Sequence, residues 1–399
     1  MGKLYEDVAK KNSKWRNSRI SEDRSGEVNH SICILHVMQG SFTYGGTPSK
    51  LLSLVVNSNP EKLRHIFLVF ANSAENLNEE FRKAGAIVEE VYRPWNWDVR
   101  FLWDILKISR RYRCAIINTH FARADIYGAI AGVLARIPVV KSVHGIAWND
   151  STWLQKLDGL LSPLRACTLC NSEATRRAVI RQTSAINTKV IYVGVPDHAV
   201  HLTAEQRITK RTELGLPSDG FVVLHVGGLI ELREQSVILR AVKQCIETGI
   251  NTYLIVVGDG PLRQRLETES RELGLSQRTH FLGYRNDVRE LNSISDVYAN
   301  MTREEGFGIA VIEAMQAGLP VVLANAGALP ELIEDGVSGL LVPLGDHAAL
   351  SRALVKLSQD RALSSQIGKA GQQRANQYFP IDKYGKAMGK LYEDVAKVY

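Results

Sequence analysis

Short apolar runs alternate with longer segments of helical spacing from residue 31 onward. The runs of the first half predict strands over residues 32–38, 65–71, 86–92, 114–118, 139–143, 166–170 and 190–193. Segments between them, such as 48–56, 99–111 and 125–135, repeat apolar residues at the spacing of one helix face. Strands that alternate with helices predict βαβ units and a parallel sheet with helices on both faces.

The same pattern starts again in the second half of the chain. Its apolar runs predict strands over residues 221–226, 252–257, 280–282, 296–299, 321–324 and 339–342. We therefore predict an α/β protein with two doubly wound, Rossmann-like domains, over residues 28–197 and 198–375. Two such domains placed face to face form a cleft at the carboxyl ends of their sheets, where open α/β sheets bind ligands.

Ten residues at the start of the chain recur near its end. The segment Met1–Lys10 is identical to Met388–Lys397. The later copy continues an apolar stripe of helical spacing, which predicts a packed last helix: Tyr384, Met388, Leu391, Tyr392 and Val395. A polar and basic stretch follows the first copy, so we expect residues 1–27 to be an extension outside the core.

Composition and charge narrow the class of protein. A chain of 399 residues with 45% hydrophobic residues can bury two cores, and five cysteines are too few for a disulfide scaffold. Residues 1–200 hold 27 Lys and Arg against 18 Asp and Glu, whereas residues 201–399 hold 22 against 24. The basic half indicates either an anionic partner or only a solvated excess of charge. No apolar run is long enough to span a bilayer or to form a signal core, so the expected location is the cytoplasm.

The segment 302–315 has the strongest chemical signal. It follows a predicted strand, turns at Gly306-Phe307-Gly308 and opens a helix. A helix start presents free N–H groups and a positive dipole end, both of which suit a phosphate. Glu305 and Glu313 are eight residues apart, roughly 12 Å along a helix, so their carboxylates can flank a bound diphosphate.

Other glycine turns end further strands. Alone each is weak evidence, but together they indicate loops that approach a phosphate: Gly45 and Gly46, Gly227 and Gly228, and Gly258 and Gly260. Arg233 follows the second of these turns, and its guanidinium can pair with phosphate. The turn at Gly45 and Gly46, which follows the first strand, is not G-x-G-x-x-G, and this disfavours a nicotinamide enzyme.

His144 ends an apolar strand of the first domain and precedes a glycine. A lone histidine is more often structural, but this position at the carboxyl end of a strand favours a functional role. His120 ends the preceding strand and is a weaker candidate.

Together these residues resemble the retaining glycosyltransferases of family 4, which have the GT-B fold. The resemblance covers roughly residues 31–380, and its most specific part is Glu305 and Glu313 in Glu-Gly-Phe-Gly-Ile-Ala-Val-Ile-Glu. It implies that Glu305 contacts the donor sugar, that Glu313 holds the ribose, and that Arg233 and the backbone of 307–309 hold the diphosphate. It places His144 beside the donor sugar, and Gly45 and Gly46 near donor phosphate and acceptor.

The resemblance also implies the reaction. A sugar would pass from a nucleotide-diphosphate sugar to an acceptor hydroxyl with retention, in polysaccharide or glycolipid biosynthesis, with no metal and no cofactor besides this co-substrate. The first domain would face the acceptor, the second would bind the donor, and a last helix over residues 376–399 would cross back to the first.

The chain departs from the family pattern at its phosphate cations. Gly228 stands where the family has Arg, and Arg233 stands where it has Lys. Arg263 and Arg303 are candidates for supplying the missing charge. Pro48 replaces the usual acidic residue after the first glycine pair, so a weakly active enzyme is one reading of these departures.

Aromatic and basic residues lie close together in the first domain. Trp95, Trp97, Phe101 and Trp103 precede Lys107, Arg110, Arg111 and Arg113. This pattern suits an anionic membrane surface and a lipid-linked acceptor, but an ordinary surface helix with buried aromatics is the slightly preferred interpretation. Two alternative functions are a nucleotide-sugar epimerase of the same fold and a non-catalytic nucleotide-sugar-binding protein. Nucleic-acid binding is not expected, because no recognised module accompanies the basic residues.

Overall fold

The computed structural model describes residues 31–38, 46–70, 77–93, 97–146, 152–200 and 202–398. The chain divides into two compact units, Met1–Gly194 with Ile381–Tyr399 and Val195–Pro380. The expected extension over residues 1–27 and the turn residue Gly45 lie outside the described residues.

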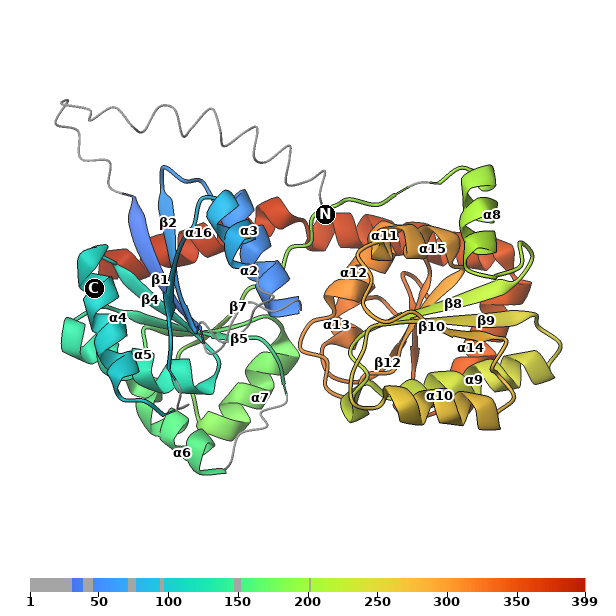
Figure 1. Ribbon diagram of the computed structural model, residues 1–399, viewed down its shortest axis with the longest axis horizontal. Helices are drawn as coiled ribbons and strands as arrows, with labels where there is room; N and C mark the ends of the chain where they lie inside the picture. Colours follow the sequence, from blue (N-terminus) through green and yellow to red (C-terminus); the bar gives the residue numbers. More distant parts are fainter. Residues whose placement is uncertain are drawn as a thin grey trace. The chain divides into compact units, whose positions relative to one another are not determined.

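A parallel sheet forms the centre of the first unit (Figure 1). Within the described residues it has seven strands in the order β3-β2-β1-β4-β5-β6-β7. The strands are β1 (Ile32–Met38), β2 (Leu63–Phe70), β3 (Ile87–Val91), β4 (Ile116–His120), β5 (Val139–Val143), β6 (Cys167–Cys170) and β7 (Thr188–Val190). Strands β1 and β5 have the predicted bounds, and the other five are displaced from the predicted runs by up to three residues.

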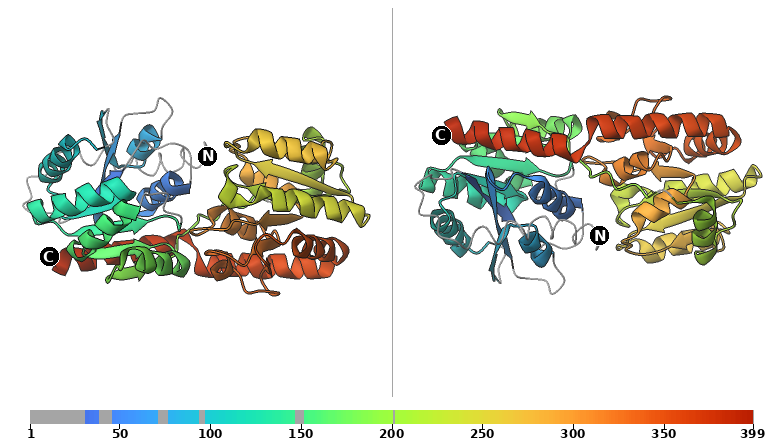
Figure 2. Two further views of the ribbon diagram at one scale, coloured as in Figure 1. Left: turned by 90° about the horizontal axis from the view of Figure 1, so that it is seen from below. Right: turned by 90° about the horizontal axis from the view of Figure 1, so that it is seen from above.

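Helices cover both faces of this sheet (Figures 1 and 2). They are α2 (Gly46–Asn57), α3 (Asn78–Lys83), α4 (Arg100–Arg111), α5 (Ala122–Ala135), α6 (Thr152–Leu161), α7 (Glu173–Thr183) and α16 (Ile381–Val398), with a 3₁₀ turn η1 (Ser162–Leu164). Leu35 of β1 packs in one core cluster with Phe101 of α4 and Tyr127 of α5. Ile34, the next residue to Leu35, packs with α2 and α16 on the opposite face. This alternation explains the continuous apolar runs, because both faces of a parallel strand are buried.

The last helix, α16, belongs to the first unit although the second unit precedes it in the chain (Figure 2). Its buried residues are the five of the predicted stripe: Tyr384, Met388, Leu391, Tyr392 and Val395. The Asn118 amide nitrogen of β4 donates a hydrogen bond of 2.7 Å to the Tyr392 hydroxyl. The expected last helix of the first domain is therefore confirmed, but it begins at Ile381, and residues 376–378 belong to α15 of the second unit.

The second unit repeats the doubly wound arrangement around a smaller sheet. Within the described residues that sheet has six parallel strands in the order β10-β9-β8-β11-β12-β13. They are β8 (Phe221–Val226), β9 (Thr252–Val257), β10 (Thr279–Phe281), β11 (Val297–Asn300), β12 (Val321–Ala324) and β13 (Leu340–Val342). The predicted α/β class with two doubly wound domains is confirmed.

Two layers of helices flank the second sheet (Figure 1). Helices α9 (Gln235–Glu247), α10 (Arg263–Glu272) and α14 (His347–Gln359) pack with one another on one face. The other face carries α8 (Ala204–Glu213), α11 (Val288–Ile294), α12 (Ile309–Gln316) and α15 (Arg361–Tyr378). Shorter elements are η2 (Glu231–Arg233) and α13 (Leu329–Leu332).

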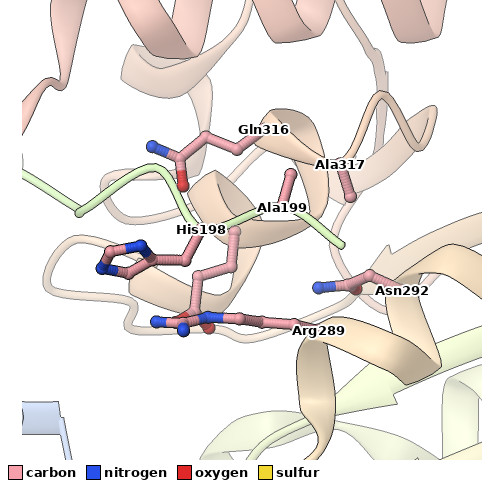
Figure 3. A pocket seen from close by; sticks show the side chains of 7 residues that line it. His198, Ala199, Arg289, Asn292, Gln316 and Ala317 are labelled. Atoms are coloured by element: carbon pink, nitrogen blue, oxygen red, sulfur yellow. The ribbon is translucent and has the colours of Figure 1, made fainter. Parts of the chain in front are cut away.

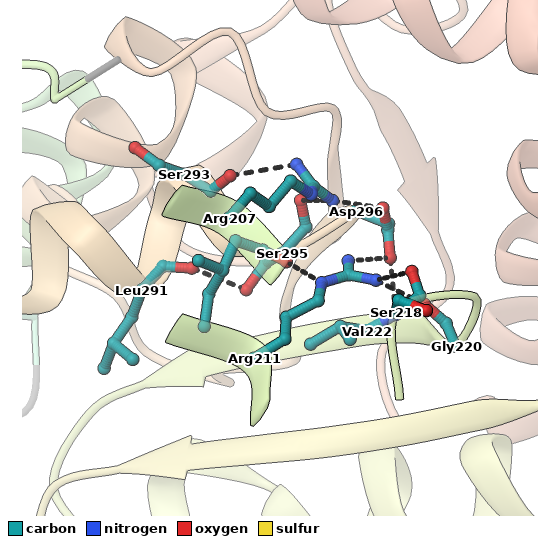
Figure 4. Close-up of polar contacts among 10 residues, drawn as sticks. Arg207, Arg211, Ser218, Gly220, Val222, Leu291, Ser293, Ser295 and Asp296 are labelled. Atoms are coloured by element: carbon teal, nitrogen blue, oxygen red, sulfur yellow. Dashed lines mark hydrogen bonds and ion pairs between the residues drawn. The ribbon is translucent and has the colours of Figure 1, made fainter. Parts of the chain in front are cut away.

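Two arginines fasten α8 to the sheet through one carboxylate (Figure 4). Arg207 and Arg211 donate to the two oxygens of Asp296 at 2.6 and 2.7 Å, and the Val222 N–H donates to the same carboxylate at 2.7 Å. Arg211 is buried and also donates to backbone carbonyls, including that of Gly220 at 2.9 Å. These bonds satisfy the buried charges, which would otherwise destabilise the unit.

None of the helices in the described part of the chain is both long enough and apolar enough to cross a membrane.

Candidate functional site

The glycine turns of the second unit pack backbone against backbone where β8 and β9 end. The Gly227 N–H donates to the Val257 carbonyl at 2.9 Å, and the Leu229 N–H donates to the Asp259 carbonyl at 3.0 Å. A Cβ on Gly258 would lie 2.2 Å from the Gly227 carbonyl oxygen, and one on Gly260 would lie 2.5 Å from that of Leu229. Gly258 and Gly260 are therefore needed for the fold of this edge.

Arg233 and Glu305 meet at the same edge. Their side chains form an ion pair between the segment after β8 and the segment after β11. The same guanidinium nitrogen, Nη1, also donates to the Thr302 hydroxyl at 3.3 Å. The Arg233 side chain is 28% exposed and that of Glu305 is 11% exposed, so the pair is at the surface of the unit but largely shielded from water. Sequence reasoning proposed these two residues separately, and the structure joins them.

The turn after β12 holds the backbone of Glu305. The Ala328 N–H donates to the Glu305 carbonyl at 2.9 Å. Gly327 has a φ of +57°, and a Cβ there would lie 2.7 Å from the Glu305 nitrogen. Only glycine fits such a close approach at a positive φ, so this turn contributes to the position of the Glu305 carboxylate.

The Gly306–Ile309 segment leads into α12. Gly308 precedes the helix with a φ of +102°. Its carbonyl accepts from the Val311 N–H at 3.0 Å, which closes the first turn. Phe307 is buried, and its ring packs edge-on against Phe379 with centroids 5.6 Å apart. The Phe307 side chain therefore anchors the turn, and the helix dipole leaves a positive end at Ile309.

Glu313 lines a polar pocket between α11 and α12, which Figure 3 shows from close by. The other lining residues are His198, Ala199, Arg289, Asn292, Gln316 and Ala317. Burial raises the pKa of Glu313, and the positive charge of Arg289 opposes that rise. Asn292 is 2% exposed, yet neither polar atom of its amide has a partner among the described residues. Because buried amides are normally hydrogen-bonded, this pocket is suited to a polar ligand.

The two arginines considered for the missing phosphate charge are engaged elsewhere. Arg263 pairs with Asp259 at 2.9 Å and with Glu267 at 2.8 Å, and Arg303 pairs with Glu234. Among the described residues, no carboxylate forms an ion pair with Arg289 of the Glu313 pocket.

His144 of the first unit lies just after β5, and both of its ring nitrogens are occupied. Nδ1 is 2.8 Å from the Lys50 amine, and Nε2 is 2.8 Å from Nδ1 of His120. Burial, with a smaller contribution from the Lys50 charge, lowers the pKa of His144 well below 6.5, so the ring is neutral at pH 7. The geometry therefore turns His144 inward, toward a network within the first unit.

Gly46 is the first residue of α2.

The predicted aromatic and basic group of the first unit is divided by the fold. Phe101 is in the core, whereas Trp103 is 67% exposed on α4. Lys107 and Arg110 follow Trp103 by four and seven residues and are exposed, which places the three on one helix face. Trp97 packs against Tyr127 and Trp153, with ring centroids 6.2 and 5.6 Å apart, and Trp95 lies outside the described residues.

Comparisons with known proteins agree with this architecture. Residues 61–198 match Glycosyltransferase Family 4, and residues 206–374 match Glycosyl transferases group 1. The chain is 28% identical over 280 residues to the UDP-Gal:alpha-D-GlcNAc-diphosphoundecaprenol alpha-1,3-galactosyltransferase of Escherichia coli, which covers 67% of this chain and 72% of that enzyme. It is 24% identical over 320 residues to the N-acetyl-alpha-D-glucosaminyl L-malate synthase of Bacillus anthracis, covering 77% of this chain and 81% of that protein.

A solved structure supports the fold. The Anabaena Alr3699/HepE protein in complex with UDP-glucose superposes with a TM-score of 0.80 at 24% identity, covering 90% of this chain and 99% of that one. Fold and sequence together define a glycosyltransferase with the GT-B fold. More particularly, the chain belongs to glycosyltransferase family 4, as the resemblance of its motifs indicated.

Sequence reasoning missed several polar residues of these sites. His36, which lies 3.1 Å from the His120 ring, and His65, which lies 2.9 Å from that of His36, occur within apolar runs, and a polar residue at a core position could have been read as a signal. Lys50, Arg289 and Asn292 are on helices whose pattern gave no such signal.

Proposed function

We propose that the protein transfers a glycosyl group, with retention, from a nucleoside-diphosphate sugar to a hydroxyl of a lipid-linked acceptor. The observation that carries this proposal is the Arg233–Glu305 ion pair beside the glycine turn that opens α12. It combines a cation for phosphate, a carboxylate for sugar hydroxyls and a positive helix end in one unit. The UDP-Gal in the name of the Escherichia coli relative and the UDP-glucose of the Anabaena structure support this class of donor.

Each group has a role in the proposed reaction. Arg233 and the start of α12 bind the diphosphate, Glu305 accepts hydrogen bonds from the donor sugar, and Glu313 binds the ribose hydroxyls. The bond between the anomeric carbon and the diphosphate oxygen breaks, and its electron pair goes to that oxygen. The acceptor oxygen bonds to the same face of the sugar, and its proton passes to the departing diphosphate.

The transition state has oxocarbenium character, as in glycoside hydrolysis. Preorganised donors that stabilise charge on a leaving group typically contribute 10²–10³-fold in rate. Arg233 and the helix dipole supply this stabilisation, so we propose that neither a metal nor a cofactor besides the nucleotide sugar is required. Unchanged transfer rates in excess chelator would support this, and a loss restored by Mg²⁺ would refute it.

A panel of nucleoside-diphosphate sugars tests the main proposal. Each is incubated with the full chain, with and without a short-chain lipid-linked sugar acceptor, and free nucleotide and glycosylated product are measured. Product of retained anomeric configuration is expected for one donor, at a rate lower by about 10²-fold or more with Glu305→Gln. A changed sugar without acceptor would indicate an epimerase, and binding without turnover of any donor would indicate a binding protein.

The acceptor proposal extends to the membrane. We propose that the exposed α4 face of Trp103, Lys107 and Arg110 contacts an anionic lipid surface at the cytoplasmic side. Neither Lys107 nor Arg110 forms an ion pair with a described carboxylate, so both charges are available to lipid phosphates. An indole and two cations on one face combine apolar and electrostatic affinity for such a surface.

Co-sedimentation with anionic vesicles tests this face. The double variant Lys107→Ala/Arg110→Ala should lose most of its salt-sensitive binding, because each basic residue near the surface contributes about 1 kcal/mol. The variant Arg240→Ala/Lys243→Ala on α9 of the second unit is the matched control for charge. Equal binding by both variants, or no salt-sensitive binding by the native chain, would refute the membrane contact.

A further inference from the structure

Four histidines form a continuous hydrogen-bonded chain through the core of the first unit. His65 Nδ1 is 2.9 Å from His36 Nε2, and His36 Nδ1 is 3.1 Å from His120 Nε2. His120 Nδ1 is 2.8 Å from His144 Nε2, where the chain ends at the carboxyl edge of the sheet. We call His65, His36, His120 and His144 the histidine relay. Consecutive rings from His36 onward are stacked, with centroids 5.4 and 5.1 Å apart, so the relay is also packed.

The inner end of the relay sets the direction of every hydrogen bond. The Ser58 hydroxyl uses its hydrogen on the Leu54 carbonyl at 2.7 Å, so it accepts from Nε2 of His65 at 3.0 Å. A neutral imidazole has one donor and one acceptor nitrogen. His65 therefore accepts at Nδ1 from His36. The same assignment repeats along the relay until Nε2 of His144 donates to His120.

The four imidazole rings of the relay are neutral at pH 7, because burial disfavours their charged form. Burial lowers the pKa of His65 to about 4. It also lowers the pKa values of His36 and His120 well below 6.5, with smaller contributions from neighbouring histidines and, for His120, from Lys50. At pH 7 the relay therefore has one tautomeric arrangement, and Nδ1 of His144 remains as its last acceptor.

Lys50 occupies that last acceptor. Its amine donates to Nδ1 of His144 at 2.8 Å, and a lysine ammonium has two further N–H donors. Among the described residues, no carboxylate forms an ion pair with this amine, and no other hydrogen bond uses its two remaining donors. Both ring nitrogens of His144 are hydrogen-bonded, so neither can bind a substrate. The Lys50 ammonium, in contrast, has two N–H donors left and no carboxylate partner among the described residues.

We propose that Lys50 binds a phosphate oxygen of a substrate and that the histidine relay positions its amine for this contact. A partly buried ammonium without a carboxylate partner is completed by an anion, and phosphate oxygens form strong charge-assisted bonds with lysine. This inference rests on the proposed function, which supplies two sources of such oxygens: the donor diphosphate and a lipid-linked diphosphate acceptor.

The proposed contact between Lys50 and phosphate depends on pH, because the amine must be protonated to carry its charge. Burial lowers the pKa of Lys50 to about 7. The titratable groups that face it are neutral at that pH: His144, His120, and Cys170 at the end of β6, whose thiol pKa burial raises to about 12. A bound phosphate favours the ammonium and raises the pKa of Lys50. Phosphate affinity should therefore be highest below pH 7 and fall as the pH rises through 7.

Binding to the full chain tests the proposal with two probes, UDP and a short-chain polyprenyl diphosphate. The variant Lys50→Met should lose about 10–100-fold in affinity for one probe, the scale of a hydrogen bond to a charged group. The exposed Lys62→Met of the same unit is the matched control and should change neither affinity more than about twofold. Loss for UDP alone identifies the donor as the source, and loss for the lipid alone identifies the acceptor. Unchanged affinity for both would overturn the proposal.

A second measurement applies even where Lys50→Met fails to fold. The Lys50 Nζ signal, assigned with Lys50→Arg, is followed by ¹⁵N NMR in the native chain as a function of pH. Saturation with the binding probe should raise its midpoint by about one pH unit or more, and an unmoved midpoint would overturn the phosphate contact.

The positioning role of the relay has its own readout. His65→Leu removes the acceptor for His36 at the far end and should shift the Lys50 midpoint and weaken probe binding, whereas His65→Gln, which can still accept and donate, should restore both. Identical midpoints in both variants would overturn this role. These experiments measure binding, so their outcome does not depend on glycosyl transfer. A failure of transfer would refute the proposed function but not the contact between Lys50 and phosphate.

Discussion

Arg233 is ion-paired with Glu305 through one of its terminal nitrogens, Nη1. Within the described residues, Nε and Nη2 of the same guanidinium have no hydrogen-bond partner. Arginine can therefore hold the carboxylate on one side and a phosphate on the other, because its donors form a rigid planar fork. The ion pair therefore holds the Arg233 guanidinium in position before a phosphate binds.

Loss of either partner should lower the transfer rate. We expect Arg233→Met or Glu305→Gln to reduce kcat/KM by about 10²-fold or more, the scale of one lost preorganised electrostatic contact. The double variant should be less impaired than the product of the two single effects, because each single change also removes the contact that positions the other residue.

The neighbouring pair Arg265–Glu231 provides the control. Its side chains are 65% and 72% exposed, so Arg265→Ala should leave kcat/KM within about twofold, in keeping with the small effect of surface ion pairs. Strictly multiplicative effects in the Arg233 and Glu305 variants would contradict the idea that the ion pair acts as a unit.

The turn at Gly327 provides a test of how Glu305 is positioned. Gly327→Ala places a Cβ 2.7 Å from the Glu305 nitrogen at a φ of +57°, so we expect a loss of about 2–5 kcal/mol in stability and a large loss of activity. Gly336 has a φ of +74° but nothing within 4 Å of its Cβ position. Gly336→Ala should therefore cost only about 1–2 kcal/mol and leave activity intact. Equal activity in the two folded variants would show that the turn does not control Glu305.

Periodicity predicted the fold well because parallel strands are buried on both faces. The apolar runs located β1, β5, β8, β9 and β12 with their bounds. Strand β7 is displaced from its predicted run, because the residues that pair with β6 are Thr188, Lys189 and Val190, and the first two are polar. The apolar stripe of α16 likewise followed from spacing alone.

The candidate site was less predictable, because its contacts join residues that are distant in sequence. The pattern indicated Arg233 and Glu305 individually, but their pairing depends on the order of β8 and β11 in the sheet. His144 was expected beside the donor sugar, and its inward hydrogen bonds depend on His120 and Lys50, which sequence spacing does not relate to it.

Variants of Gly228 test the effect of having glycine where the family pattern has arginine. A Cβ there would have only the Asp259 carbonyl oxygen within 4 Å, at 3.8 Å, so the backbone has room for a side chain. We expect Gly228→Arg to raise the affinity for UDP by about tenfold, because a second guanidinium adds a charge-assisted bond to phosphate. Gly228→Met adds similar bulk without charge and should bind no more tightly than the native chain. An equal gain in both variants would attribute the effect to packing.

The histidine relay should make the first unit sensitive to acid. An unfolded histidine takes up a proton near pH 6.5, whereas His65 in the fold does so only at about 4. Between these values the unfolded chain binds more protons, so the relay's contribution to stability is complete above pH 6.5 and is lost as the pH falls toward 4. The contributions of His36, His120 and His144 to stability also fall with falling pH, because their pKa values are lowered as well.

Urea unfolding at pH 7, 6 and 5 measures this dependence. Each relay histidine should contribute a slope of roughly 1.4 kcal/mol per pH unit within that window. His65→Gln keeps a donor for Ser58 and an acceptor for His36 but cannot titrate, so its slope should be smaller by about one proton while its stability at pH 7 changes little. An undiminished slope in His65→Gln would mean that His65 is already protonated in the fold at pH 5, and the single tautomeric arrangement of the relay would then be wrong.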